Sequence, residues 1–201
     1  NNIKGVYHVL EAARELSVMR VVLASTMQTI NNLPWTTRMI RLEDGTAPRN
    51  PYGATKVFAE ALGQSYAANH KMAIIAARLG WLPRTPHDHG RITHDATKAI
   101  YLSHDDVGRF AVCSVEAPAE QIHCDWPPMN KGRFAAVFVT SRAPGVVLLD
   151  PEPARRVVGY EGQDVFPAGC HYPQASAVGR TDESEAARRR RGATSTAARA
   201  C

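Results

Sequence analysis

Residues 19–26 read MRVVLAST and residues 71–79 read KMAIIAARL, and these two runs decide the fold class. Each run is short and largely apolar, which is typical of a strand buried on both faces of a parallel sheet. A helical pattern precedes each of them, over 2–17 and over 51–69, with apolar residues at spacings of three and four. Helix, strand, helix, strand is the alternation of an α/β protein, so we predict a parallel sheet flanked by helices.

The helix at 51–69 has a well-marked start. Asn50 is a favourable N-cap, and Pro51 suits the first helical position because its missing N–H would lack a partner there. Beyond residue 80 the pattern is looser. The elements expected there are, in order, a loop over 81–94, a helix over 107–115 capped by Ser103, strands over 134–140 and 145–149, and a short helix from Asp150 to Gly159.

Composition indicates an ordinary globular protein. The 201 residues are 44% hydrophobic and 21% charged, enough for one sizeable core. No apolar run reaches the roughly 18 residues of a membrane-spanning helix, and no secretory signal is visible at Asn1. The four cysteines lack a CxxC pair, and His87, His89 and His94 fit no metal motif, so we expect no metal. Free thiols favour a reducing compartment, and we expect the cytoplasm.

The segment 170–201 differs from the body of the chain. It holds few large apolar residues and six arginines against three acidic residues, so it carries most of the net charge of +5. Such a segment cannot offset its ordering entropy by burial, so we predict one domain over 1–169 followed by a disordered tail. The run 188–191 (RRRR) also suits a nucleic-acid or nuclear signal, but a solvated tail is favoured and a shifted reading frame stays open. The body has no basic excess, so nucleic acid is not an expected partner.

Tyr52 and Lys56 are the strongest candidates for chemistry. The sequence YGATK places them four residues apart, on one face of the predicted helix. A tyrosine is normally a poor base, with a pKa of about 10, and a neighbouring ammonium favours its phenolate form. A tyrosine tuned in this way exchanges a proton with a substrate hydroxyl. The strand MRVVLA ends in Ser25 and Thr26, at the edge where parallel sheets bind ligands.

Five segments in order resemble the extended short-chain dehydrogenases/reductases, the NAD-dependent epimerase/dehydratase family. The first is NIKG with VLEAAREL, and the second is VVLAST with APRNPYGATKVFAE. The third is IIAARLG, the fourth is YLSHDDVGRF, and the fifth is DPEPARRVVGYEGQD. The resemblance covers residues 1–169 and implies a Rossmann-type, doubly wound sheet with a small carboxyl-terminal substrate region. It implies an NAD(P)-dependent oxidoreductase acting on a hydroxyl or lactol of a sugar or sugar acid. A nucleotide-sugar epimerase or dehydratase, or a catalytically silent binding protein on the same fold, remain alternatives.

The resemblance also implies roles for individual residues. Tyr52 matches the catalytic acid/base, Lys56 its activator and ribose ligand, and Thr26 the hydroxyl that orients the substrate. Asn2 matches the asparagine that supports the proton relay. The backbone at Leu79 and Gly80, with Ser25, matches cofactor-binding positions beside Tyr52 and Lys56.

Within the family the chain looks most like the uronate dehydrogenases. ARLGWLPRTP followed by Arg91 resembles the loop in which those enzymes hold a sugar carboxylate, so Arg91 is the candidate ligand and Arg84 its rival. Gln28 and Trp81 fall at positions of small polar substrate contacts. Trp81 departs from that pattern through its bulk, which puts the same sugar substrate in doubt.

The glycine-rich turn of the family is not found in these 201 residues. That turn holds the cofactor pyrophosphate, and a residue after it selects NAD or NADP. We therefore expect NAD without excluding NADP, and expect the chain to be an amino-terminally truncated fragment. Alone, it should expose apolar surface and bind dinucleotide poorly. The helices at 2–17 and 52–69 are those that the family commonly pairs in a dimer, so a homodimer is expected for the parent protein.

Overall fold

The computed structural model describes residues 1–122 and 132–172, and it has the α/β architecture expected from the sequence. Strands β1 (Arg20–Thr26), β2 (Ala73–Leu79) and β3 (Arg133–Val139) form a parallel sheet in the order β1–β2–β3. Ser25 pairs with Arg78, and Thr26 pairs with Leu79, so the ends of β1 and β2 coincide. The helices are α1 (Lys4–Glu15), α2 (Pro51–Asn69), α3 (Pro86–Gly90), α4 (Asp95–Ala99), α5 (His104–Glu116) and α6 (Glu152–Val158).

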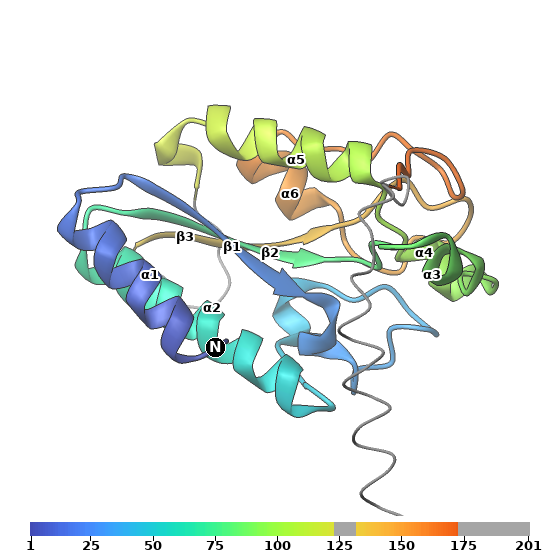
Figure 1. Cartoon of the computed structure of the whole chain (residues 1–201), viewed down its shortest axis with the longest axis horizontal. Helices are drawn as coiled ribbons and strands as arrows, with labels where there is room; N and C mark the ends of the chain where they lie inside the picture. Colours follow the sequence, from blue (N-terminus) through green and yellow to red (C-terminus); the bar gives the residue numbers. More distant parts are fainter. Residues whose placement is uncertain (123–131, 173–201) are drawn as a thin grey trace, which may run out of the picture. The chain divides into compact units, whose positions relative to one another are not determined.

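The helices cover both faces of the sheet. Figure 1 shows α1 and α2 below the strands, α5 and α6 above them, and α3 and α4 beyond the ends to which the strands point. Helix α2 approaches the sheet closely at Gly63, where an added Cβ would lie 2.7 Å from Leu23 Cδ1. The three layers confirm the predicted class of a partial Rossmann-type fold.

The two predicted strands differ in burial. Residues Ala73–Ala77 of β2 are at most 1% exposed, as expected for a central strand. The prediction that β1 is buried on both faces is wrong, because β1 lies at the edge of this sheet and Val22 is 41% exposed. Exposed apolar residues also flank it, among them Val18 and Met19. The expected exposure of apolar surface around this strand is thus present.

Two predictions for the second half of the chain are corrected. Residues 145–149 form no strand, and only Leu149 makes an isolated parallel bridge, with Ile40. The loop over 81–94 contains the short helix α3, because the Thr85 hydroxyl accepts a hydrogen bond from the Asp88 N–H and caps its first turn. The α5 and α6 predictions are confirmed, with Ser103 capping α5 and Gly159 ending α6 in a left-handed conformation.

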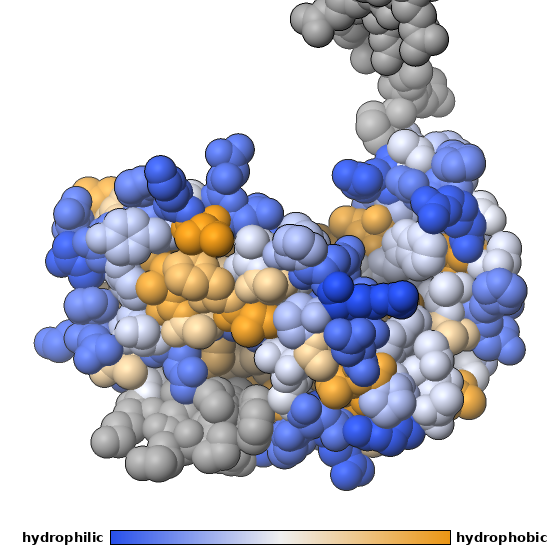
Figure 2. Space-filling model, turned by 90° about the horizontal axis from the view of Figure 1, so that it is seen from below, coloured by the Kyte–Doolittle hydropathy of each residue, from blue (hydrophilic) through white to orange (hydrophobic). Residues whose placement is uncertain are grey.

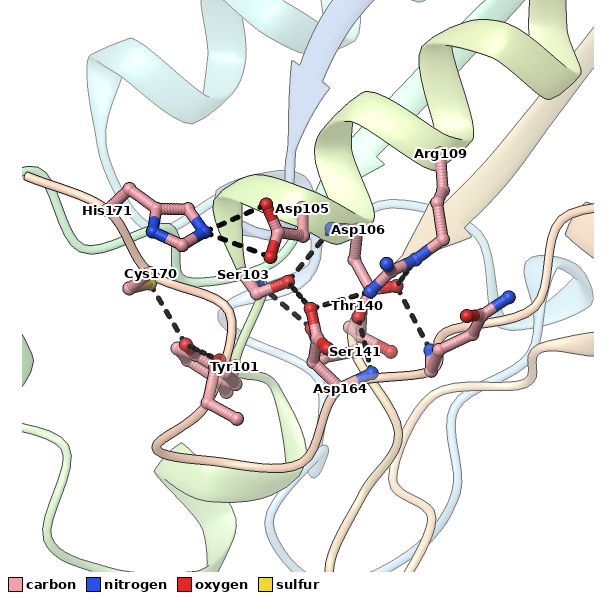
Figure 3. A network of polar contacts seen from close by, with 12 residues as sticks. Tyr101, Ser103, Asp105, Asp106, Arg109, Thr140, Ser141, Asp164, Cys170 and His171 are labelled. Atoms are coloured by element: carbon pink, nitrogen blue, oxygen red, sulfur yellow. Dashed lines mark hydrogen bonds and ion pairs between the residues drawn. The ribbon is translucent and has the colours of Figure 1, made fainter.

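A buried polar network ties α5 to the segment that follows α6 (Figure 3). The Asp106 carboxylate is fully buried and accepts hydrogen bonds from the N–H groups of Gln163 and Asp164 and from Arg109 Nε. Arg109 Nη2 also lies 2.6 Å from Asp164 Oδ2, to which the Ser103 hydroxyl donates at 2.5 Å. The network therefore fixes the loop after α6 against the first turns of α5.

The predicted tail over 170–201 falls almost wholly beyond the described residues. In the described part of the chain, no helix has the length and apolar character to cross a membrane.

Candidate active site

A cleft of about 820 Å³ opens at the carboxyl ends of β1 and β2. Its size suits a small-molecule site, and its place is where parallel α/β sheets bind ligands. The lining combines strand ends, the start of α2 and the segment that leads to α3. The lining residues are Ser25, Thr26, Met27, Gln28, Asn31, Trp35, Tyr52, Leu79, Gly80, Trp81, Leu82, Arg84, Thr97 and Ile100.

Tyr52 and Lys56 lie together on α2, as the spacing predicts. The Lys56 ammonium is 5.6 Å from the centre of the Tyr52 ring, a cation–π distance. Lys56 Nζ donates a hydrogen bond of 2.8 Å to the carbonyl oxygen of Ala24 on β1. This bond anchors the ammonium to the strand while Tyr52, 42% exposed, faces the cleft.

Thr26 is held at the end of β1 by the 3₁₀ helix η1 (Met27–Ile30). Its hydroxyl accepts a hydrogen bond of 3.3 Å from the Gln28 N–H, and its carbonyl accepts one of 2.9 Å from the Thr29 hydroxyl. The Gln28 side chain is not free, because its Oε1 accepts a hydrogen bond of 2.7 Å from Asn50 Nδ2. Asn50 Oδ1 in turn accepts from the Gly53 N–H and caps α2. The η1 segment and α2 are therefore both held by Asn50.

The close approach of α2 to the Gln28 backbone should require glycine at position 53. A Cβ added there would lie 2.4 Å from the Gln28 carbonyl oxygen, too close for either backbone to remain in place. We expect Gly53→Ala to lower the free energy of unfolding by about 1–3 kcal/mol, measured by urea denaturation. Gly108→Ala is the control, since nothing lies within 4 Å of its Cβ position on α5. The control should stabilise by about 0.5–1 kcal/mol, and equal losses in the two variants would contradict the account.

Ser25 lies at the floor of the cleft but directs its hydroxyl inward. The side chain is 4% exposed, and Oγ donates a hydrogen bond of 2.5 Å to Glu60 Oε1. Glu60 also forms a buried ion pair with Arg78 of β2, at 2.9 Å. Sequence reasoning missed this cluster. The signal available was a carboxylate four residues after Lys56 and an arginine inside an otherwise apolar strand.

The two candidate substrate arginines occupy different places. Arg84 lines the cleft, whereas Arg91 does not, and the Arg91 guanidinium stacks 5.8 Å from the centre of the Trp81 ring. Trp81 itself lines the cleft, and its backbone pairs with Tyr101 in an isolated parallel bridge. Of the two arginines, Arg84 therefore lies where a ligand in the cleft could contact it.

The other predicted residues also have clear positions. Leu79 and Gly80 line the cleft, and the Gly80 N–H donates to the Val139 carbonyl oxygen at 2.9 Å. Asn2 is exposed in the turn before α1 and does not line the cleft. Among the described residues, no three His, Cys, Asp or Glu side chains are arranged to hold a metal ion.

The sequence of residues 1–105, just over half of the chain, matches the NAD dependent epimerase/dehydratase family. The chain therefore belongs to that family, and the resemblance inferred from its motifs is confirmed.

Individual relatives are also dehydrogenases. The chain is 31% identical over 162 residues to L-arabinose 1-dehydrogenase (NAD(P)(+)) of Haloferax volcanii, and this match covers 72% of this chain and 64% of that protein. It is 35% identical over 82 residues to uronate dehydrogenase of Pseudomonas putida, covering 39% of this chain and 29% of that one. The fold matches glucuronic acid dehydrogenase from Chromohalobacter salexigens with a TM-score of 0.64 at 28% identity, over 83% of this chain and 55% of that one. The chain thus spans less than two thirds of each of these relatives.

Proposed function

We propose that this chain carries the catalytic site of an NAD(P)-dependent oxidoreductase acting on a hydroxyl or lactol of a sugar or sugar acid. One observation carries the proposal. Thr26 and Tyr52 line one cleft at the carboxyl edge of the sheet, and Lys56 stands behind Tyr52 on the same helix. The related dehydrogenases of arabinose and uronate support the substrate class.

The cleft is the proposed site of the nicotinamide half of the cofactor. Leu79 and Gly80 line it together with Tyr52. Lys56, one helical turn further along α2, is the proposed ribose ligand, and its ammonium has further N–H groups besides the one bonded to Ala24. When bound, NAD accepts the hydride that a carbon bearing the hydroxyl releases on oxidation. The preference for NAD over NADP is part of this proposal.

The residues of the chain handle the proton. Tyr52 takes the proton of the substrate hydroxyl, and the Lys56 ammonium lies 5.6 Å from the centre of its ring. The Thr26 hydroxyl orients the same substrate oxygen toward Tyr52. Hydride and proton leave separately, so the carbon loses two electrons while Tyr52 gains one proton. Asn2, in the turn before α1, is proposed as the supporting residue of the relay.

An anionic group on the substrate has one cationic partner in this cleft. Arg84 is the sole charged residue among the described residues that line it. A guanidinium binds a carboxylate or phosphate through two parallel hydrogen bonds. We propose that Arg84 binds the acid group of a sugar acid, that Trp81 and Gln28 shape the sugar site, and that Arg91 supports Trp81.

Substitution of the two arginines separates these roles. We expect Arg84→Met to raise the KM for a uronate about tenfold to a hundredfold, the range for losing hydrogen bonds to a charged group. The KM for neutral L-arabinose should change little. Arg91→Met is the matched variant, and steady-state kinetics with both sugars is the measurement. A larger effect on uronate from Arg91→Met than from Arg84→Met would reverse the assignment.

An epimerase or dehydratase would use the same residues but return the hydride to the sugar. Incubating the parent polypeptide, meaning the longest natural polypeptide that contains these 201 residues, with NAD and a sugar panel separates the two. A dehydrogenase accumulates NADH with the oxidised sugar. Conversion of the sugar without NADH would favour the alternative, and a silent binding protein would convert none.

The proposed assembly is a homodimer in the cytoplasm. Figure 2 shows an apolar patch over the face that carries α1 and α2, and the exposed apolar residues on or beside these helices include Ile3, Tyr7, Val9 and Phe58. The Tyr66 hydroxyl on α2 donates a hydrogen bond to Glu11 on α1, which joins the two helices. Pairing of this face with a second copy would bury the patch.

The free thiols of Cys113 and Cys170 support a reducing compartment.

A further inference from the structure

A buried polar cluster lies directly beneath the proposed catalytic pair. It consists of Ser25 on β1, Glu60 on α2 and Arg78 on β2, which are 4%, 7% and 2% exposed. Ser25 Oγ donates to Glu60 Oε1 at 2.5 Å, and Arg78 donates to both carboxylate oxygens, at 3.0 Å from Nε and 2.9 Å from Nη2. The cluster therefore links one helix to two adjacent strands by directional bonds.

Stability is a poor explanation for this cluster. Burying an ion pair carries a large desolvation cost, and apolar side chains of similar volume are often as stable. The cluster is also incompletely satisfied, because Arg78 Nη1 is buried without a hydrogen-bond partner in the described part of the chain. A buried donor of that kind weakens the folded state.

Positioning explains the cluster better. Four of the six residues that α2 buries are small, namely Gly53, Ala59, Gly63 and Ala67, and Gly63 packs directly on the sheet. Small side chains let a helix approach closely, but they resist rotation and sliding weakly. Glu60 supplies a directional contact at this interface, and buried polar groups are best attested as devices that set register.

The contacts of the cluster lie next to those of the proposed catalytic residues, on both α2 and β1. Tyr52, Lys56 and Glu60 follow at intervals of four on α2, so they share one face. Lys56 bonds the Ala24 carbonyl and Glu60 bonds Ser25, while Thr26 comes next on the strand. Any rotation of α2 that moved Tyr52 away from Thr26 would break the bonds of Glu60.

We propose that Ser25, Glu60 and Arg78 are positioning residues that lock α2 in the register bringing Tyr52 and Lys56 to Thr26. The proposal rests on the proposed function. A displacement of about 1 Å at a reacting group can cost a hundredfold in rate, so a modest loss of register is sufficient to matter.

The test is an apolar replacement of the whole cluster in the parent polypeptide, Ser25→Ala with Glu60→Met and Arg78→Met. We expect the thermal midpoint to be kept or raised, while kcat falls about tenfold to a hundredfold. The KM for the sugar should change less than kcat. A folded variant with an unchanged kcat would overturn the proposal.

A milder pair of variants covers the case in which the triple variant does not fold. Ser25→Ala removes one buried hydroxyl that donates to an ion-paired carboxylate. Ser103→Ala is its match, because Ser103 also donates to a carboxylate, Asp164, that is paired with an arginine. Ser103 does not line the cleft. We expect Ser25→Ala alone to lower kcat at a temperature where both variants are folded, and equal kcat values would overturn the proposal.

A readout without turnover separates this proposal from the proposed function. NMR of ¹³C-tyrosine-labelled protein, with Tyr52 assigned through Tyr52→Phe, reports the surroundings of that ring. We expect the Tyr52 signal to shift in Ser25→Ala and to stay in place in Ser103→Ala. If the wild type oxidises no sugar, the proposed function fails and this signal still decides on positioning. An unmoved Tyr52 signal in Ser25→Ala would overturn it.

Discussion

Tyr52→Phe should reduce kcat for sugar oxidation by about 10²- to 10⁴-fold, the range for removing a general acid/base. Phenylalanine keeps the ring against which Lys56 packs at 5.6 Å, so α2 should stay in place. Only the hydroxyl is lost, and with it the group that takes the substrate proton. Steady-state formation of NADH by the parent polypeptide is the measurement.

Tyr7→Phe is the matched control for this substitution. Tyr7 is 46% exposed on α1, similar to the 42% of Tyr52, and it does not line the cleft. Its kcat should equal that of the wild type. A Tyr52→Phe protein that turned over as fast as Tyr7→Phe would remove Tyr52 from the chemistry.

Asp106→Ala should cause the largest loss of stability, about 3–5 kcal/mol in the free energy of unfolding. The substitution would leave Arg109 Nε and the N–H groups of Gln163 and Asp164 without their acceptor inside the protein. Urea denaturation of the 201-residue chain at neutral pH is the measurement. Asp95→Ala is the control, because its side chain is fully exposed and pairs only with Lys98 among the described residues, and surface changes of this kind are worth about 0.5 kcal/mol or less.

The Asp106 carboxyl also makes stability depend on pH. Burial alone raises its pKa, but hydrogen bonds from the Ser141 hydroxyl, Gln163, Arg109 and Asp164 outweigh burial and hold that pKa below its usual value. A lowered folded-state pKa contributes stability above the unfolded-state pKa of about 3.9, and this stability is lost as the pH falls through the folded-state value. Asp106→Asn should therefore flatten the decline in stability below about pH 4. If stability declined below this pH as steeply in Asp106→Asn as in the wild type, this role of Asp106 would be contradicted.

The central helix–strand unit could be predicted because its signals are local. Asn50 and Pro51 mark the start of α2, and the four-residue spacing of Tyr52 and Lys56 places them on a common face of the helix. The strand–helix alternation then places Thr26 at the same edge of the sheet. These features need no knowledge of distant contacts.

Other parts depend on contacts that the sequence does not show. Edge or centre position decides the burial of β1, and both strands look equally apolar in the sequence. The choice between Arg84 and Arg91 depends on how the loop around α3 folds, which brings Arg84 to the cleft and Arg91 to the Trp81 ring. Glu60 and Arg78 are 18 residues apart, so their pairing emerges only from the packing of α2 on β2.

Transfer of deuterium from a sugar labelled at the oxidised carbon is the most direct test of the proposed chemistry. The parent polypeptide would be incubated with NAD and C1-deuterated aldoses or uronates, and the nucleotide would be analysed by mass spectrometry. We expect one deuterium in each reduced nicotinamide, in equal amount to the oxidised sugar, and loss of this product in Tyr52→Phe. Deuterium that is retained in a rearranged sugar, or a labelled nicotinamide formed equally well by Tyr52→Phe, would contradict it.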